Sequence, residues 1–244
     1  MIYTIGSQKI DVPETGPERK IRTPRQVVPW RDVAETCRTL DAICSVIEDK
    51  PRKIIDGIAR AGFWGAVFRD HWPKCKLLLN EEDPTCMPIL KKNFPDDVLY
   101  TKNIKNWTPP KADISLLDFD HFTLRILSQW ENVLKRWSPK ARYFIIADGA
   151  CFGWKFGNMK HYGINDPEKY FYLLDRAMAK FIDKRITTVS SFANASTILL
   201  EDVKPRNIKF LSPSKLYLSR GGKVYTNVAD RKAAKIERKG LFDA

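Results

Sequence analysis

Polar side chains follow the short apolar segments of this 244-residue chain, at the points where each segment ends. At four of these ends they are Asp56, Glu81, Asn103 and the pair Asp118 and Asp120. Carboxylates accept hydrogen bonds from hydroxyl and amine groups, and the small residues after Asp56 let the backbone approach a ligand closely. In an open parallel sheet, ligands bind in the crevice outside the carboxyl ends of the strands. The pattern therefore predicts a ligand site at that edge of a sheet.

The elements that must position these side chains alternate between strand and helix. Short apolar runs predict strands at residues 53–56, 76–80, 98–101, 114–119, 142–147, 186–191 and 196–200. Helical spacing predicts helices over residues 62–71 and 123–137, and Asp-Pro pairs predict helix starts at residues 83 and 166. Repeated strand–helix–strand units indicate an α/β fold with a doubly wound, mostly parallel seven-stranded sheet and helices on both faces. The last two segments predict a terminal antiparallel hairpin.

Three segments follow from this organisation. Residues 1–50 form an N-terminal arm and helix, in which residues 1–28 are rich in proline and polar residues and predict an extended arm. The helix begins near Asp32, with apolar residues at helical spacing up to Ile47, and the run stops at Lys50-Pro51. Residues 51–203 form the α/β domain, and residues 204–244 form a basic C-terminal extension.

Charge is concentrated in that extension. The chain carries 42 Lys and Arg against 29 Asp and Glu, a net charge of +13, and residues 204–244 hold eleven basic and three acidic residues. Such a local excess indicates a polyanion partner, most simply DNA or RNA, although a solubilising tail has the same composition. A predicted helix at residues 230–239 places two basic pairs seven residues apart on one face: Arg231, Lys232, Arg238 and Lys239.

Other residue types exclude several classes of protein. Five cysteines form neither an even set nor a CxxC pair, which favours the cytoplasm or another reducing intracellular compartment. No apolar run approaches the ~18 residues of a membrane span. The three histidines lack ligand spacing, so we expect no metal site. The sequence gives no indication of the oligomeric state.

Three motifs, in order, resemble those of a known family. The segment from Asp56 to Gly62 stands where class I S-adenosylmethionine-dependent methyltransferases have an acid followed by Phe/Leu-Ala-Gly-Ser/Thr-Gly. The segment Glu81-Glu82-Asp83-Pro84 matches the acidic tip of the second strand in that family, and residues 86–94 resemble the helix after it. The segment Asp120-His121-Phe122-Thr123 occupies the place of the Asp/Asn-Pro-Pro-aromatic motif of enzymes that methylate exocyclic base amines. Residues 51–201 therefore resemble the nucleic-acid-modifying branch of this family, with a Rossmann-like domain.

The resemblance implies a cofactor, S-adenosylmethionine, and a role for each residue of the strand ends. The methionine part of the cofactor would be surrounded by Asp56, Gly57, Ala61 and Gly62. Glu81 would bind the ribose hydroxyls and Asn103 the adenine edge. Asp120 would orient the acceptor base, with Asp118 supporting it.

Two departures from the family pattern leave alternatives open. Arg60 replaces a small residue of the cofactor loop, where it crowds the methionine part, pairs with the methionine carboxylate or extends into solvent. The fourth-strand motif lacks both prolines and the aromatic residue. The chain is thus either an active methyltransferase or a catalytically silent relative that binds nucleic acid or serves as an assembly subunit. A protein methyltransferase is a third interpretation, which the local basic excess does not favour.

Overall fold

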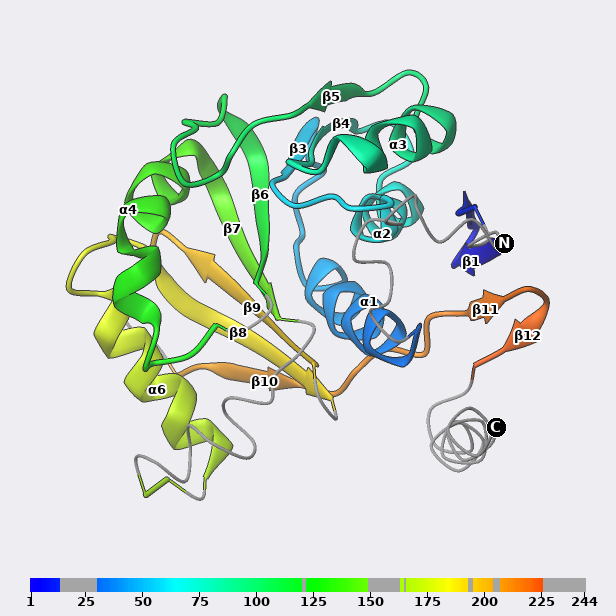
Figure 1. The fold of residues 1–244 in the computed structure, drawn as a ribbon. Helices are drawn as coiled ribbons and strands as arrows, with labels where there is room; N and C mark the ends of the chain where they lie inside the picture. The colour runs from blue at the N-terminus through cyan, green and yellow to red at the C-terminus, as the bar shows by residue number, and fades with distance from the viewer. Residues whose placement is uncertain are drawn as a thin grey trace, which may run out of the picture.

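The computed structural model describes residues 1–13, 30–119, 122–148, 163–164, 166–192, 195–203 and 207–225, which form two sheets (Figure 1). The larger sheet has eight strands in the order β10-β8-β9-β7-β6-β3-β4-β5. In chain order they are β3 (Lys53–Asp56), β4 (Lys76–Asn80), β5 (Val98–Tyr100), β6 (Ala112–Phe119), β7 (Ala141–Asp148), β8 (Arg185–Phe192), β9 (Ala195–Glu201) and β10 (Lys209–Leu211).

This topology confirms the doubly wound α/β fold and corrects one detail. Neighbouring strands run parallel except at β9, which is antiparallel to both β7 and β8. The predicted terminal hairpin is therefore β8–β9. The prediction of seven strands was wrong, because β10 adds an eighth by pairing parallel to β8.

Helices cover both faces of the sheet and enclose a core on each. The helices α1 (Trp30–Cys44), α2 (Phe63–His71) and α3 (Met87–Asn93) bury their apolar side chains with Ile54, Leu77 and Leu116. The helices α4 (Leu127–Trp137) and α6 (Pro167–Met178) cover the other face with Ile55 and Leu117. Successive side chains of a strand point to opposite faces, so consecutive apolar residues of one strand contribute to both cores.

Aspartate caps begin two helical segments where the Asp-Pro pairs predict them. Asp83 Oδ1 accepts a hydrogen bond from the Thr85 amide at 2.9 Å, and the turn η1 (Pro84–Cys86) then leads into α3. Asp166 Oδ1 accepts one from the Glu168 amide at 2.9 Å at the start of α6. The remaining short turn, η2 (Ser138–Lys140), follows α4.

The N-terminal segment is not an extended arm over its first thirteen residues. It forms the hairpin β1 (Ile2–Ile5) and β2 (Gln8–Asp11), turned at Gly6, whose φ of 57° favours glycine. Strands β11 (Leu218–Arg220) and β12 (Lys223–Val224) complete a four-stranded antiparallel sheet in the order β12-β11-β1-β2. The two ends of the described chain thus meet in one sheet, which packs against α2.

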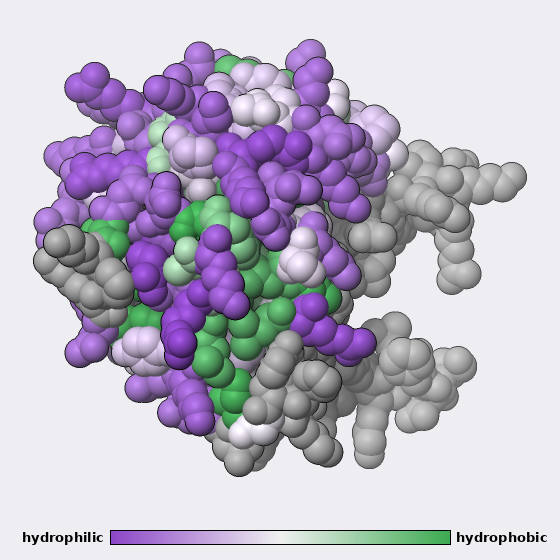
Figure 2. Space-filling view, turned by 90° about the vertical axis from the view of Figure 1, so that its left-hand side faces the viewer, coloured by the Kyte–Doolittle hydropathy of each residue, from purple (hydrophilic) through white to green (hydrophobic). Residues whose placement is uncertain are grey.

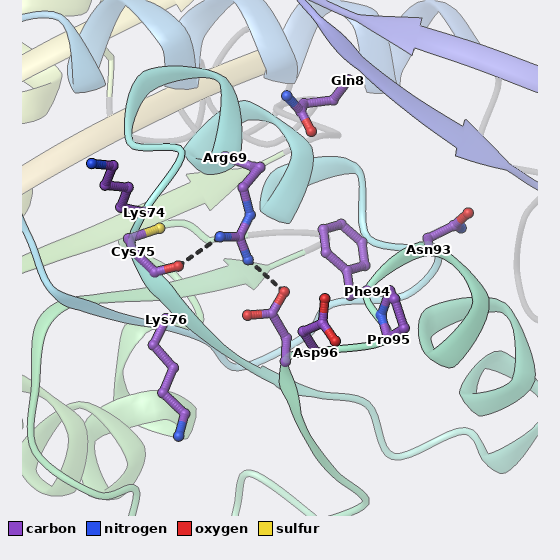
Figure 3. A pocket seen from close by; sticks show the side chains of 10 residues that line it. Gln8, Arg69, Lys74, Cys75, Lys76, Asn93, Phe94, Pro95 and Asp96 are labelled. Atoms are coloured by element: carbon purple, nitrogen blue, oxygen red, sulfur yellow. Dashed lines mark hydrogen bonds and ion pairs between the residues drawn. The ribbon is translucent and has the colours of Figure 1, made fainter.

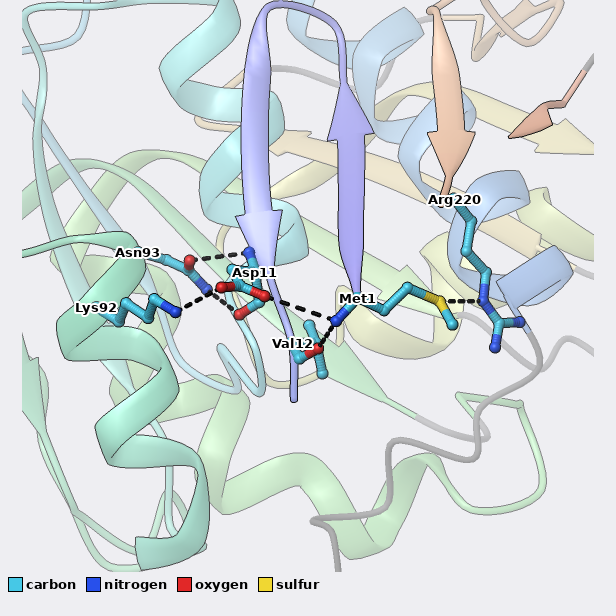
Figure 4. A network of polar contacts seen from close by, with 6 residues as sticks. All are labelled: Met1, Asp11, Val12, Lys92, Asn93 and Arg220. Atoms are coloured by element: carbon cyan, nitrogen blue, oxygen red, sulfur yellow. Dashed lines mark hydrogen bonds and ion pairs between the residues drawn. The ribbon is translucent and has the colours of Figure 1, made fainter. Parts of the chain in front are cut away.

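Polar contacts attach this hairpin to α3 (Figure 4). The Asp11 amide donates to Asn93 Oδ1 at 3.0 Å, and Asn93 Nδ2 donates back to the Asp11 carbonyl at 3.2 Å. Lys92 Nζ lies 2.5 Å from the Asp11 carboxylate, and Arg220 Nε lies 2.8 Å from Met1 Sδ. The open end of the hairpin, where Met1 and Asp11 lie side by side, is therefore joined to α3 through Asp11 and to β11 through Met1.

The surface over α4 and α6 is mostly hydrophilic, with hydrophobic residues gathered toward its centre (Figure 2). Half-buried Leu124, Leu173, Ala177 and Phe181 pack against the second core. Within the described ranges, no helix has the length and apolarity that crossing a membrane requires. The four cysteines of these ranges, Cys37, Cys44, Cys75 and Cys86, are buried and free.

Candidate active site

The loop between β3 and α2 runs along the carboxyl ends of the neighbouring strands. The Gly57 amide donates to the Leu116 carbonyl of β6 at 2.9 Å, and the Ala59 amide donates to the Asn80 carbonyl of β4 at 2.8 Å. Two residues of the loop, Arg60 and Gly62, have positive φ values of 50° and 93°. The loop is therefore held from both sides in a fixed, partly strained conformation.

Asp56 presents a buried carboxyl group at the start of this loop. Its side chain is fully buried, and Oδ1 accepts a hydrogen bond from the Ile58 amide at 3.2 Å. Oδ2 has no hydrogen-bond partner among the described residues. Burial, with the nearby Asp118 and Glu81 carboxylates, raises the pKa of Asp56 well above its usual range. A buried polar oxygen without a partner is a position where a ligand donor is favoured.

Glu81 follows β4 and fixes the other side of the loop. Its Oε2 accepts from the Arg60 amide at 2.8 Å, and its Oε1 accepts from the Asp83 amide at 2.9 Å. An ionised carboxylate offers about four acceptor positions, so two are left for hydroxyl donors. Glu81 thus both shapes the loop and keeps the capacity to bind a ligand.

Arg60 turns inward toward the tip of β6. Its Nη2 lies 3.6 Å from Asp118 Oδ2, and the side chains are 21% and 2% exposed. Trp64 Nε1 on α2 donates to the same carboxylate oxygen at 3.3 Å. The alternative in which Arg60 extends into solvent is therefore wrong, and its partner is the fourth-strand acid itself.

A row of four side chains, polar at three positions, continues from Asp118 across the sheet. Asp118 is in register with Ala147, Ala147 with Thr197, and Thr197 with Ser190. Residues directly opposite on neighbouring strands point to the same face. Thr39 Oγ1 of α1 lies 2.8 Å from Thr197 Oγ1, so α1 and α2 together cover this row.

This row was not predicted from the sequence. Thr197 and Ser190 are fully buried, and Ser190 Oγ has no hydrogen-bond partner among the described residues. A signal was present, because serine and threonine residues are concentrated in the sequence at residues 187–191 and 196–197, on both sides of residues 192–195. The row extends the polar lining of the site toward the hairpin β8–β9.

Asn103 belongs to the loop after β5, and Asn80 links that loop to the one after β3. Asn103 is exposed, with its Nδ2 donating to Glu82 Oε1 at 2.8 Å. Asn80 is fully buried, and its Nδ2 donates to the carbonyls of Gly57 and Lys102, both at 2.9 Å. The predicted contact of Asn103 with an adenine edge remains a prediction, whereas Asn80 is a positioning residue that the sequence reasoning missed.

The small residues of the loop are explained in part by packing. A Cβ on Gly57 would overlap Leu117 and Trp137, and a Cβ on Gly62 would overlap the ring of Phe94. Ala61 is fully buried in the core under α2. The room beside these residues is thus filled by the chain itself, so contact with a cofactor would come through the backbone.

Five predicted site residues lie outside the described residues. They are Asp120, Arg231, Lys232, Arg238 and Lys239. Among the described residues, no group of three or more His, Cys, Asp or Glu side chains is arranged to hold a metal ion.

A separate pocket of about 360 Å³ opens at the amino ends of β4 and β5 (Figure 3). Arg69 crosses it to bind the Cys75 carbonyl at 2.7 Å and Asp97 Oδ2 at 2.5 Å. Asp97 Oδ1 accepts from the Leu77 amide at 2.9 Å. These polar groups already satisfy one another, so the pocket is a structural junction, distant from the acids at the carboxyl ends.

Comparison with known proteins finds relatives in structure alone. No protein-family model matches the chain, and no curated protein sequence matches it. A protein of Nostoc punctiforme assigned as an O-methyltransferase superposes with a TM-score of 0.52 and 14% identity, over 68% of this chain and 56% of that one. The plantazolicin methyltransferase BpumL, solved with S-adenosylhomocysteine, gives a TM-score of 0.51 and 12% identity, over 78% of this chain and 92% of that one.

A third similar structure, the pyocyanin biosynthetic protein PhzM, gives a TM-score of 0.45 at 12% identity, with 67% of this chain and 54% of that one covered. The chain thus spans little more than half the length of two of these proteins. At such identities the likeness shows the fold, which is that of the Rossmann-like, class I methyltransferases.

Proposed function

We propose that this protein is an S-adenosylmethionine-dependent methyltransferase. The observation that carries the proposal is the buried Oδ2 of Asp56, which has no hydrogen-bond partner among the described residues, beside a loop held between acids of the two strands that flank β3. The fold supports it, because in this fold ligands bind at that crevice. The positions of Asp56, Glu81 and Asp118 in the sequence, which resemble the family's motifs, support the proposal independently.

The residues present suit such a cofactor. Asp56 would receive the ammonium group of the methionine part, which would favour the ionised carboxylate. The two remaining acceptor positions of Glu81 suit the ribose hydroxyls. When bound, the cofactor supplies a methyl group on a positively charged sulfur, so the protein contributes mainly alignment and charge.

For the acceptor we assign Asp118, with Asp120 as the predicted orienting residue. The Asp118 carboxylate lies at the tip of β6 and accepts hydrogen bonds, so it can hold an amine N–H and take its proton as the nitrogen gains the methyl group. The hydroxyl groups of Thr197 and Ser190, in the same row beyond Ala147, add further donors and acceptors.

Titration calorimetry with S-adenosylmethionine and S-adenosylhomocysteine tests the cofactor. We expect binding by the wild type and a loss of roughly 1.5–3 kcal/mol in Glu81→Ala, because a charge-assisted hydrogen bond to the ribose is removed. Asp96→Asn, an exposed carboxyl at the far end of the sheet, serves as the control and should bind like the wild type. A folded wild type that does not bind either compound at millimolar concentration would contradict the proposal.

We propose nucleic acid, DNA or RNA, as the acceptor. The support is the net charge of +13 and the eleven basic residues of the C-terminal extension. Neutralising Arg231, Lys232, Arg238 and Lys239 should lower the slope of log affinity against log salt by up to about three to four units on duplex DNA. Neutralising four exposed lysines elsewhere, Lys53, Lys74, Lys76 and Lys91, is the matched control. Equal slopes in the wild type and the C-terminal variant would remove this partner site.

A catalytically silent methyltransferase-like protein that binds nucleic acid or serves in assembly is the second candidate. The ion pair between Arg60 and Asp118 favours it, because the pair joins the cofactor loop directly to the acceptor side of the site. This candidate predicts nucleic-acid binding without cofactor binding. The calorimetric and salt experiments together distinguish the two.

A further inference from the structure

Arg60 contacts both Glu81 and Asp118, two acids with different roles in the proposed function. Its backbone amide donates to Glu81 Oε2 on the ribose side, and its guanidinium pairs with Asp118 on the acceptor side. No other residue of the β3–α2 loop within the described ranges joins both acids in this way. Arg60 therefore connects the ribose side and the acceptor side of the proposed site.

The backbone at Arg60 has an uncommon conformation that fixes the direction in which the side chain leaves the loop. A φ of 50° is uncommon for a residue with a Cβ and has to be stabilised by its surroundings. The hydrogen bond from its amide to Glu81 at 2.8 Å supplies such a restraint. A residue that only filled space would not need this conformation.

The geometry of the contact between Arg60 and Asp118 allows Arg60 to leave it for another carboxylate. At 3.6 Å it is longer than the 2.7–2.9 Å typical of charge-assisted hydrogen bonds. The Asp118 carboxylate is 2% exposed, and Trp64 Nε1 also donates to it, so withdrawing Arg60 removes one positive group from a buried carboxylate. A new donor at that place, such as the N–H of an acceptor amine, compensates for this loss.

We propose that Arg60 is a positioning residue that moves between Asp118 and the carboxylate of the cofactor's methionine part. This inference rests on the proposed function. With the site empty, the guanidinium is paired with Asp118; with cofactor bound, it pairs with the methionine carboxylate, bidentate geometry being available to it. Asp118 is then released for the acceptor, so the cofactor binds before the acceptor.

Two ligands that differ only in the carboxylate test this exchange: S-adenosylmethionine and its decarboxylated form. We expect the wild type to prefer the carboxylate form by about tenfold to a hundredfold, the worth of a hydrogen bond to a charged group. Arg60→Gln should abolish most of that preference and change the affinity for the decarboxylated form less than threefold. Arg60→Lys keeps the charge and should retain part of the preference.

Asp118→Asn provides the sharper variant, because it removes the competing partner. We expect it to bind S-adenosylmethionine severalfold more tightly than the wild type and the decarboxylated form unchanged. Arg52→Gln, an exposed arginine at the other end of β3, is the matched control, and circular dichroism confirms that each variant is folded. A mere packing role of Asp118 would lower the affinity for both ligands.

The remaining outcomes overturn the exchange. Equal losses for both ligands in Arg60→Gln would make Arg60 a structural residue, and gains for both would make it a block of the site. Unchanged affinities would show that it has no role in binding. If no variant binds either ligand, the proposed function fails and this inference fails with it.

Discussion

The buried carboxyl group of Asp56 should make the stability of the protein depend on pH. An unfolded aspartate has a pKa of about 3.9, whereas burial raises the pKa of Asp56 in the folded state well above that value. The folded state therefore holds this proton more tightly than the unfolded state does. Between the two pKa values the free energy of unfolding contributed by Asp56 falls as pH rises, by up to about 1.4 kcal/mol per pH unit.

Asp56→Asn isolates this contribution because asparagine keeps the shape but does not titrate. The retained oxygen can still accept from the Ile58 amide, while the new NH2 group stands where Oδ2 has no partner. In the protonated wild type the Oδ2 hydroxyl is likewise a donor without a partner among the described residues, so the two proteins carry a similar cost near pH 4. We therefore expect similar free energies of unfolding near pH 4, and a rise of the variant's value relative to wild type as pH increases.

Urea unfolding of both proteins at pH 5, 6, 7 and 8 measures the difference. If Asp56 stays protonated from pH 5 to 7, the free energy of unfolding of the variant should rise relative to wild type by up to about 2.7 kcal/mol over that range. Asp96→Asn, at an exposed position, should follow the wild type. A constant difference between Asp56→Asn and wild type from pH 5 to 8 would refute the assignment of a raised pKa.

Three further predictions concern the β3–α2 loop, the separate pocket around Arg69, and the proton on Asp56. Gly62→Ala should lower the melting temperature, because the φ of 93° and the Phe94 ring both oppose a Cβ, and Phe94→Leu should restore part of the loss in the double variant. Asp97→Asn should cost about 1–3 kcal/mol by leaving Arg69 without its carboxylate, yet leave cofactor affinity unchanged. Below the raised pKa of Asp56, cofactor binding should release a proton from it, so the calorimetric enthalpy should depend on the buffer's ionisation enthalpy. An enthalpy independent of the buffer from pH 5 to 7 would contradict the contact of Asp56 with the ammonium group.

The central strands were predictable because they are buried on both faces. Strands β3 and β4 have the predicted bounds, and their apolar runs need no knowledge of partners. The strands missed by the sequence reasoning, β1, β2 and β10 to β12, have two to four residues and lie in the small sheet or at the edge of the large one. Such short strands form because tertiary neighbours supply their hydrogen bonds, which a local pattern does not reveal.

For the helices too, starts that depend on a local interaction were predictable, and the start of α4 was not. The two Asp-Pro starts were predictable because a cap is a local interaction. The start of α4 was predicted at Thr123 and lies at Leu127, since the Ile126 amide bonds to the Thr123 carbonyl in a preceding turn.

In the site, the sequence predicted which strand ends carry acids but not what those acids contact. The spacing correctly placed Asp56 and Glu81 at the carboxyl ends of β3 and β4. The direction of Arg60 depends on a hydrogen bond from its amide to a residue twenty-one positions away, and the role of Asn80 depends on two loops meeting. Long-range contacts of this kind follow from the fold, so no local pattern contains them.

The charges around the β3–α2 loop constrain where a nucleic acid would sit. Asp56, Glu81 and Asp118 are three buried carboxyl groups, and among these groups and Arg60 acidic charge exceeds basic charge whenever more than one carboxyl group is ionised. Buried acids repel a phosphate strongly, because the effective dielectric there is low. They attract a ligand with an ammonium and a sulfonium group, and they accept hydrogen bonds from a neutral amine. A phosphate backbone would therefore stay outside this crevice, so the proposed reaction requires the acceptor base to enter without its phosphates and the basic extension to hold the backbone elsewhere.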